Sequence, residues 1–266
     1  MALLRIEAGG TVIMQTLDAL TEIARQAGER IQQVRREGLT IASKLGGEVV
    51  TSADRASHEI MMAGFGRHFP DLPRVTEESA EHHIPRPPFL VADELDGTAP
   101  FSHGLGDWGV MLALVDEAGP SHGVMVLPDR GVLVRAARGQ GCVINGQPVA
   151  LGPGDDPAAT LVAMDLNRQL QPAQWQRLQK LAAACQGVRS HYCAAVSTYE
   201  LLAGHLGLYV NCIGGRIWDF AVPALAVREA GGCVAAPAGG GLVWDRVPMG
   251  LVATADESLM ALWRGL

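Results

Sequence analysis

The amino-acid sequence predicts a layered α/β fold, and three patterns indicate it. Residues 15–36 place their apolar side chains on one stripe, which is the pattern of an amphipathic helix packed on a core. Residues 108–149 contain strand-length apolar runs separated by turn sequences, as in an antiparallel meander. From residue 160 onward, strands alternate with helices. Because hairpins accompany this alternation, we expect layered sheets and helices rather than a pure array of βαβ units.

The other elements follow in order along the chain. In the first half we expect a short strand within 46–54, a helix at 55–69, a short strand at the start of 74–79, and a buried strand at 87–93. A link rich in Gly, Pro and Asp follows at 151–157. In the second half we expect a strand at 160–165, helices at 172–186 and near 194–206, a strand at 207–212, a helix at 218–230, strands within 231–237 and 250–254, and a closing helix at 255–265.

Length, charge and cysteine content bound the class of protein. The chain has 266 residues, enough for one large α/β domain or two small ones. Its net charge of −7 offers no basic surface for a nucleic acid polymer. The five cysteines form no CxxC pair and are odd in number, which favours a reducing cytoplasm over a disulfide framework. We expect neither a signal peptide nor a membrane partner, because the sequence lacks the apolar runs that these require.

The acidic residues that stand out lie at the ends of apolar runs rather than on helix faces. Strand ends and helix starts are where α/β folds gather their binding sites. Taken singly, most of these residues have a structural explanation, because a carboxylate can cap a helix or lie in a solvated loop. Asp93 and Asp96 resist that explanation, since two carboxylates that flank a strand end suit a hard divalent cation. The whole group consists of Asp54, Glu77, Glu78, Asp93, Asp96 and Asp219.

Gly97 and Thr98 follow these carboxylates directly. A glycine lets backbone N–H groups approach an anion, and the start of a helix favours phosphate at the same place. Carboxylates that hold metal ions beside a phosphate cradle indicate phosphate chemistry, in which metals polarise phosphoryl oxygens and acidify a water molecule.

Four blocks of this chain resemble the inositol monophosphatase superfamily of Mg²⁺-dependent, lithium-sensitive phosphomonoesterases. The family signature, roughly D-P-[IL]-D-G-T-x-N-F-x-H-G, is similar to "DELDGTAPFSHG" at 93–104. The family's V-T-x-x-D resembles "VTSAD" at 50–54, and its G-E-E-S resembles "TEES" at 76–79. Its C-terminal block resembles "WDFAVPALAVREAGG" at 218–232, and residues 123–149 look like its central region. The blocks occur in the family's order, so together they are far more specific than any one alone.

The resemblance implies a fold and an organisation. The fold would be the five-layer αβαβα sandwich of the inositol monophosphatase and fructose-1,6-bisphosphatase type. A single domain would span 1–266, with most metal ligands in an N-terminal part of about 1–150. A C-terminal part of about 158–266 would contribute Asp219 and the substrate loop. The resemblance also implies a homodimer and a small phosphate ester as substrate.

The resemblance implies a ligand set for two to three Mg²⁺ ions. Glu77, Asp93 and the carbonyl of Leu95 would hold the first ion. Asp93, Asp96 and Asp219 would hold the second, and Glu77 would serve a weaker third ion through water.

It also implies the catalytic groups. Thr98, paired with Asp54, would orient and deprotonate the attacking water, with Glu77 contributing through its metal ions. The backbone N–H groups of Gly97 and Thr98 would grip the phosphate. Water would attack in line, without a phosphoenzyme.

The chain departs from the family signature at Glu94, which stands where the family has proline. We expect this side chain to point outward, where it would have no effect. If it faces the metals instead, it would tighten metal binding or repel phosphate. Thr76 replaces a glycine and Pro100 an asparagine, and we expect both changes to be tolerated and to reshape the loop at most.

The largest departures concern the substrate pocket. Cys212 stands where inositol phosphatases place a glutamate that accepts bonds from inositol hydroxyls, and a thiol is a poor acceptor. The family's Gly-[ST]-Ala reads "CAA" at 193–195, which places Ala194 and Ala195 against the substrate. Arg216 is either a surface residue or the partner of a second anionic group.

These departures leave the substrate open. Inositol phosphates, 3′-phosphoadenosine 5′-phosphate, fructose 1,6-bisphosphate and histidinol phosphate are all candidates. An alternative of another class is a phosphate- or metal-binding regulatory protein that keeps the fold without turnover. The complete ligand set and the Asp54–Thr98 pair favour the enzyme.

Overall fold

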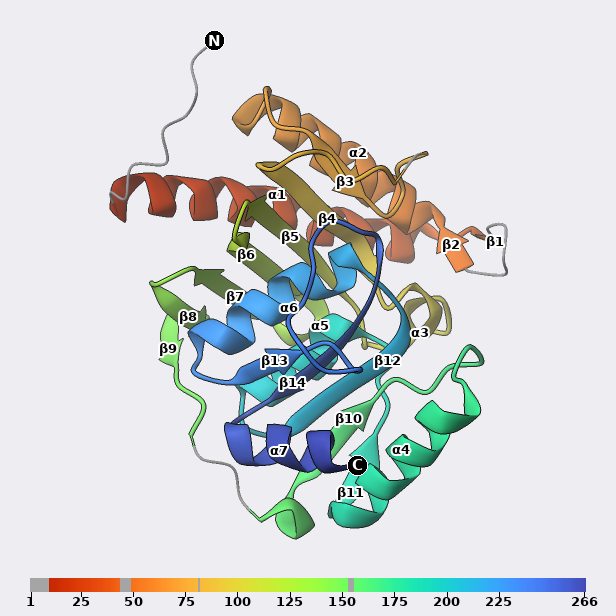
Figure 1. The fold of residues 1–266 in the computed structure, drawn as a ribbon. Coiled ribbons are helices and arrows are strands. Elements are labelled where there is room, and N and C mark those ends of the chain that lie inside the picture. The colour runs from red at the N-terminus through yellow and green to blue at the C-terminus, as the bar shows by residue number, and fades with distance from the viewer. Residues whose placement is uncertain (1–9, 44–48, 81, 153–155) are drawn as a thin grey trace.

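The chain folds into two large β-sheets and three layers of helices, stacked alternately (Figure 1). The computed structural model describes residues 10–43, 49–80, 82–152 and 156–266. From one side to the other, the layers are helices α1 and α2, a seven-stranded sheet, helices α5 and α6, a five-stranded sheet, and helices α4 and α7. This order confirms the predicted αβαβα sandwich.

The first layer contains α1 (Gly10–Glu37) and α2 (Ser52–His68). The apolar stripe predicted for α1 is buried against the seven-stranded sheet and α2. The helix α2 begins earlier than the predicted residue 55, because the hydroxyl of Thr51 accepts a hydrogen bond from the N–H of Ala53 (3.1 Å) and caps it. The buried residues of the α1 stripe are Leu17, Leu20, Ile23, Ala24, Ala27, Ile31 and Val34.

The seven-stranded sheet has the order β3-β4-β5-β6-β7-β8-β9. All neighbours are antiparallel except β3 and β4, so the predicted meander is confirmed. Every residue of β4 is buried, and the strand continues through Asp96 rather than ending at Asp93. The strands are β3 (Arg74–Thr76), β4 (Phe89–Asp96), β5 (Gly109–Asp116), β6 (Gly119–Leu127), β7 (Val132–Ala137), β8 (Gly141–Ile144) and β9 (Gln147–Val149).

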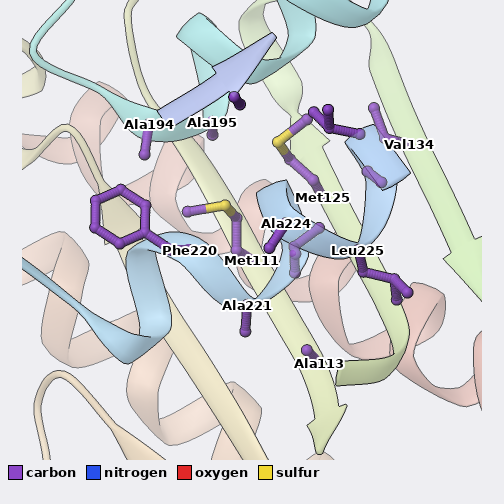
Figure 2. Close-up of a cluster of buried hydrophobic side chains, with 14 of the residues drawn as sticks. Met111, Ala113, Met125, Val134, Ala194, Ala195, Phe220, Ala221, Ala224 and Leu225 are labelled. Carbon is purple, nitrogen blue, oxygen red and sulfur yellow. The ribbon is translucent and has the colours of Figure 1, made fainter. Parts of the chain in front are cut away.

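The middle layer consists of α5 (Ala194–Leu202) and α6 (Ile217–Glu229). Ten of the eleven residues from Ile217 to Val227 in α6 are buried, all but Asp219, as expected for a helix covered on both sides by sheets. Figure 2 shows Ala221 and Ala224 of α6 in the same buried cluster as Met111 and Ala113 of β5. These small side chains let α6 lie close to the sheet, which fixes where its first turn points.

The five-stranded sheet has the order β11-β10-β12-β14-β13. Strand β10 is parallel to both β11 and β12, so the carboxyl ends of β10 and β12 lie at the same edge. The outer helices α4 (Pro172–Ala184) and α7 (Glu257–Gly265) cover the far face. The strands are β10 (Leu161–Met164), β11 (Gly187–Arg189), β12 (Leu208–Arg216), β13 (Cys233–Ala235) and β14 (Pro248–Thr254).

Several short elements were not predicted. They are the strand β1 (Ile41–Ser43), which pairs with β2 (Val49–Thr51), the strand β11, the one-turn helix α3 (Thr98–Ser102), and the 3₁₀ turns η1 (Pro128–Arg130) and η2 (Pro157–Ala159). Each is too short to leave a periodic pattern in the sequence. In the described part of the chain, no helix is both long enough and apolar enough to cross a bilayer. The single domain over 1–266 stays a prediction.

Candidate active site

A cavity of about 680 Å³ lies between the two sheets. Its walls come from the end of β4, the loops after β3 and β10, the end of β12, and the first turns of α3, α5 and α6. Nine of the twelve residues predicted for the site line it, namely Glu77, Asp93, Leu95, Asp96, Gly97, Thr98, Ala194, Arg216 and Asp219.

A bulge in β4 brings two of the predicted metal ligands to the same side. In a regular strand, residues three apart point to opposite faces. Opposite β5, however, Asp93 pairs with Met111 while Asp96 pairs with Gly109, so β4 contains one extra residue. The extra residue reverses the alternation and turns both carboxylates toward the cavity. One oxygen of each then lies within 4.8 Å of an oxygen of Asp219 and of the other.

These three carboxylates repel one another. Burial first, and then the charges of Glu77, Asp96 and Asp219, raise the pKa of Asp93 well above its ordinary value. Burial and the charge of Asp96 raise the pKa of Asp219 to about 7. Among the described residues, Asp93 Oδ2 has no hydrogen-bond partner although it is buried. Three buried acids with a spare oxygen fit a divalent cation, because its charge offsets the repulsion and its oxygen-rich coordination uses the spare atom.

Backbone groups hold two of these carboxylates in place. The N–H of Ala195, at the start of α5, donates to Asp96 Oδ2 (2.6 Å), and the thiol of Cys193 donates to the same oxygen (3.0 Å). The N–H of Arg216 donates to Asp219 Oδ2 (2.5 Å) in the first turn of α6. The helix-capping explanation for Asp219 is therefore correct, and it is compatible with a ligand role for the second oxygen. Ala195 is not among the described residues that line the cavity, whereas Ala194 is.

Asp54 and Thr98 form the expected pair. The hydroxyl of Thr98 lies 3.0 Å from Asp54 Oδ1 and 2.8 Å from the carbonyl oxygen of Leu95, and its single hydrogen can serve either acceptor. The other oxygen of Asp54 accepts from the N–H and the hydroxyl of Thr51 (2.7 and 2.6 Å). Burial raises the pKa of Asp54 despite these bonds. Asp54 therefore both caps α2 and faces Thr98, which lines the cavity.

Glycine is the one residue type that this turn accepts at position 97. Its φ is +83°, in the left-handed region that favours glycine. A Cβ atom would lie 2.4 Å from the carbonyl oxygen of Asp107 and 3.1 Å from the side chain of Cys193. The turn places Gly97 and Thr98 at the cavity surface, directly before α3.

Glu94 does not point outward as the sequence suggested. It is fully buried, and it is not among the described residues that line the cavity. Its Oε2 accepts a hydrogen bond from the N–H of Glu77 (3.1 Å), and its Oε1 lies 2.6 Å from Nδ1 of His58. The bond to Glu94 is the main reason that the pKa of His58 is raised. Glu94 therefore fastens the loop that carries Glu77 and neither faces the metal site nor meets the solvent.

Comparison with known proteins places this site in a family. Residues 13–264 match the family described as the inositol monophosphatase family. The chain belongs to the inositol monophosphatase family. Members of the family are phosphoric monoester hydrolases that depend on metal ions.

Individual relatives agree with this assignment. The chain is 32% identical to a histidinol-phosphatase of Chlorobaculum parvum over 219 residues, which cover 82% of this chain and 84% of the relative. It is 31% identical to the Nus factor SuhB of Pasteurella multocida, over 82% and 84% of the two chains. Among solved structures, the extragenic suppressor protein suhB of Bartonella henselae superposes with a TM-score of 0.83 at 26% identity, over 95% and 97% of the two chains. The relatives thus share both the fold and nearly the full length.

The structure does not bring Cys212 into the cavity. Cys212 is not among the described residues that line it, and it packs against the outer cluster beneath α4 and α7. Its neighbour Asn211 lines the cavity instead, because successive side chains of a strand point to opposite faces. Burial raises the pKa of the Cys212 thiol to about 11, so it carries no charge at neutral pH.

Several polar residues of the cavity were missed from the sequence, and two of them, Asp165 and Asn211, are hydrogen-bonded to each other. Asp165 directly follows the buried strand β10. An acidic residue at the end of an apolar run is the same signal that singled out Asp93, so Asp165 could have been found from the sequence. Asn211 gives no such signal, because its place depends on which face of β12 meets the cavity.

Proposed function

We propose that this member of the inositol monophosphatase family is a Mg²⁺-dependent phosphomonoesterase that hydrolyses a small phosphorylated metabolite. The observation that carries the proposal is the group formed by Asp93, Asp96 and Asp219, with the Asp54–Thr98 pair on the same cavity. Bound Mg²⁺ would polarise the phosphoryl oxygens, acidify a water molecule and neutralise the leaving oxygen. We propose two to three ions, held by Glu77, Asp93, the Leu95 carbonyl, Asp96 and Asp219.

The chain's own groups would prepare the water. When the Thr98 hydroxyl donates to Asp54, its lone pairs can accept a hydrogen bond from water, and the Leu95 carbonyl is left for a cation. Asp54 can then take up the proton that Thr98 relays, and its raised pKa makes it a better base than an exposed aspartate. The N–H groups of Gly97 and Thr98 would bind the phosphate at the cavity surface.

Phosphate release from a panel of esters tests this proposal. The panel contains inositol 1-phosphate, 3′-phosphoadenosine 5′-phosphate, fructose 1,6-bisphosphate, histidinol phosphate and glycerol 2-phosphate. We expect release from at least one ester with Mg²⁺, and none after addition of EDTA. Release that persists with EDTA, or no release from any ester at saturating Mg²⁺, contradicts the proposal.

The resemblance supports further properties of the enzyme. We propose that lithium inhibits it, that it forms a homodimer and that it works in the cytoplasm. All five cysteines are free thiols, in keeping with a reducing compartment. Lithium titration of the active enzyme and light scattering at two protein concentrations check the first two.

A second candidate is a regulatory protein without turnover. One observation favours it, the 31% identity to a relative named Nus factor SuhB. The enzyme is the better proposal, because the ligand set and the Asp54–Thr98 pair are complete. The panel above separates the two, since only the enzyme releases phosphate.

A further inference from the structure

Two residues that line the cavity together with the metal-binding acids, Asp165 and Asn211, each carry a buried acceptor oxygen without a partner among the described residues. Asp165 Oδ2 accepts hydrogen bonds from the hydroxyl of Tyr209 (2.5 Å) and from Nδ2 of Asn211 (3.0 Å). This leaves Asp165 Oδ1 and Asn211 Oδ1, which are both buried and have no hydrogen-bond partner among the described residues. Asp165 is 6% exposed and Asn211 8%, and both residues line the cavity.

The contact with the Asp165 carboxylate fixes which way the side-chain amide of Asn211 is turned. If its amide were turned round, its carbonyl oxygen would face the Asp165 carboxylate, and two acceptors would repel. The amide nitrogen therefore faces Asp165, and the carbonyl oxygen is the spare atom. The subsite thus offers two acceptor oxygens that have no hydrogen-bond partner among the described residues.

The subsite is also rigid. The N–H of Asp165 donates to the carbonyl of Val210 (3.0 Å), which continues the pairing of β10 with β12. Two residues further on, Nδ2 of Asn167 donates to the carbonyl of Ile213 (2.7 Å) and ties the same loop to β12. Both acceptors are therefore in position before a ligand arrives.

A buried acceptor without a donor is unfavourable, and a buried carboxylate without a counter-charge is more so. Asp93, Asp96 and Asp219 can be offset by metal ions, but Asp165 is not in their close group. A ligand that brings donors and a positive charge would satisfy both spare oxygens. Neutral hydroxyl groups would satisfy the hydrogen bonds but leave the carboxylate charge uncompensated.

We propose that Asp165 and Asn211 bind the alcohol half of the phosphate ester and select an alcohol that carries a protonated amine. This inference rests on the proposed phosphatase function, because the metal-binding acids in the same cavity would hold the phosphate half. Arg216 lines the cavity too, and an alcohol with a second phosphate is the competing class of substrate.

Matched esters test the inference. We would compare 3-aminopropyl phosphate with butyl phosphate, which differ by ammonium in place of methyl, and repeat this with one carbon fewer and one more. The wild-type ratio of kcat/KM, amine over alkyl, is expected to exceed about tenfold at the best spacing. Asp165→Asn keeps the volume and removes the charge, so this ratio should fall to within about threefold of unity.

Two control variants separate the loss of the Asp165 charge from other effects, and a further ester tests the competing class of substrate. Asp245→Asn makes the same chemical change at a side chain that is 70% exposed and outside the described cavity lining, and it should keep the wild-type ratio. Tyr209→Phe removes one donor that orients Asp165 but keeps its charge, so its ratio should lie between those of wild type and Asp165→Asn. Propane-1,3-diol bisphosphate tests the competing class.

Each outcome is decisive. The inference is overturned if wild type prefers no amine at any spacing, if it prefers the bisphosphate, or if Asp165→Asn keeps the wild-type ratio. If wild type hydrolyses neither these esters nor any ester of the earlier panel, the proposed phosphatase function has failed instead. The dissociation constants of 3-aminopropyl and butyl phosphate, measured by calorimetry with Mg²⁺, then replace kcat/KM in the same comparison.

Discussion

Two parts of the cavity lining, which we call the metal end and the alcohol end after their proposed roles, hold their acids in different ways. At the metal end, three carboxylates lie within reach of one ion, and backbone N–H groups at the starts of α5 and α6 fix Asp96 and Asp219. At the alcohol end, a single carboxylate, Asp165, is fixed by the side chains of Tyr209 and Asn211. The metal end is thus tied to the main fold, whereas the alcohol end depends on a few replaceable side chains.

This difference separates catalysis from selection. A change at the metal end affects every substrate, because every phosphate ester presents the same phosphate there. A change at the alcohol end should alter the ratio between substrates, because only this end meets the part in which they differ. The following predictions test whether catalysis and substrate selection depend on these two separate parts of the cavity.

The largest effect is expected from Asp96→Asn. The asparagine can still accept the N–H of Ala195, so the fold should persist, but one negative charge of the metal site is lost. A metal site supplies several kcal/mol of transition-state stabilisation, so kcat should fall about a thousandfold. Phosphate release at saturating Mg²⁺ measures it, with Asp245→Asn as the control. Turnover within tenfold of wild type would refute the role of Asp96 as a metal ligand.

The next effect concerns the stability of the alcohol end. Burial raises the pKa of Asp165 to about 6 from an ordinary value of 3.8. A raised carboxylate pKa means that the folded state binds the proton more tightly, so Asp165 lowers stability progressively as the pH rises from about 4 to above 6. By the pKa difference, this cost reaches on the order of 3 kcal/mol at neutral pH, about a hundredfold in the unfolding constant.

Asp165→Asn should therefore raise the melting temperature at pH 7.5 and change it much less at pH 4. Thermal unfolding of both proteins without ligand, across this pH range, measures the difference. A variant that is less stable than wild type at pH 7.5 would show that the bonds of Asp165 outweigh its buried charge. A gain in stability with a loss of amine selectivity is the pattern of a residue retained for binding.

The same division explains what could be predicted from the sequence. The acids of the metal end stand in short motifs, and Asp93 to Thr98 are nearly contiguous, so residue order alone brings them together. The bulge that aims Asp93 and Asp96 the same way was not predicted, because it is set by pairing with β5 and not by β4 itself. The layered fold was predictable because long amphipathic and apolar runs define its helices and strands.

The alcohol end could not be located by counting along the chain. Counting back seven residues from Asp219 leads to Cys212. Between Asn211 and Gly215, however, four residues of β12 oppose two of β14, so sequence distance and position in the sheet no longer correspond. Tyr209 and Asn211 meet Asp165 only because β10 and β12 are parallel neighbours, and strand order is not visible in the sequence.

Glu94 is not among the described residues that line the cavity, but it holds the loop that carries Glu77. Substitution of Glu94 should therefore have an intermediate effect on activity. Glu94→Gln puts an amide where a carboxylate now accepts the N–H of Glu77 and contacts His58. A glutamine whose oxygen accepts from Glu77 turns its NH2 group toward Nδ1 of His58, where a protonated imidazole cannot accept, and the charge that raises the pKa of His58 is lost. The loop that carries Glu77 should therefore loosen. Groups that position a metal ligand are worth about 10- to 100-fold in metal affinity. We expect the Mg²⁺ concentration for half-maximal activity to rise about tenfold.

His58→Gln is the matched comparison for Glu94. It removes the imidazole but leaves Glu94 Oε2 bonded to the N–H of Glu77, so its Mg²⁺ requirement should rise less than that of Glu94→Gln. Titration of activity with Mg²⁺ at fixed ester concentration measures both variants. If Glu94→Gln changes the ratio between amine and alkyl esters instead of the Mg²⁺ requirement, the division between the two ends breaks down.

The smallest effect is expected from Cys212→Ala, which tests the alternation along β12. Because Cys212 packs on the outer cluster, its truncation should lower stability by about 1 kcal/mol, as for the loss of a small part of a buried side chain. The kcat/KM ratio of 3-aminopropyl to butyl phosphate should stay within about twofold of wild type, since the side chain that faces the cavity is that of Asn211. Asn211→Ala removes the inward neighbour and should lower that ratio. If Cys212→Ala lowers the ratio as far as Asn211→Ala does, the two positions do not face opposite sides, and the alcohol end must be placed one residue further along β12.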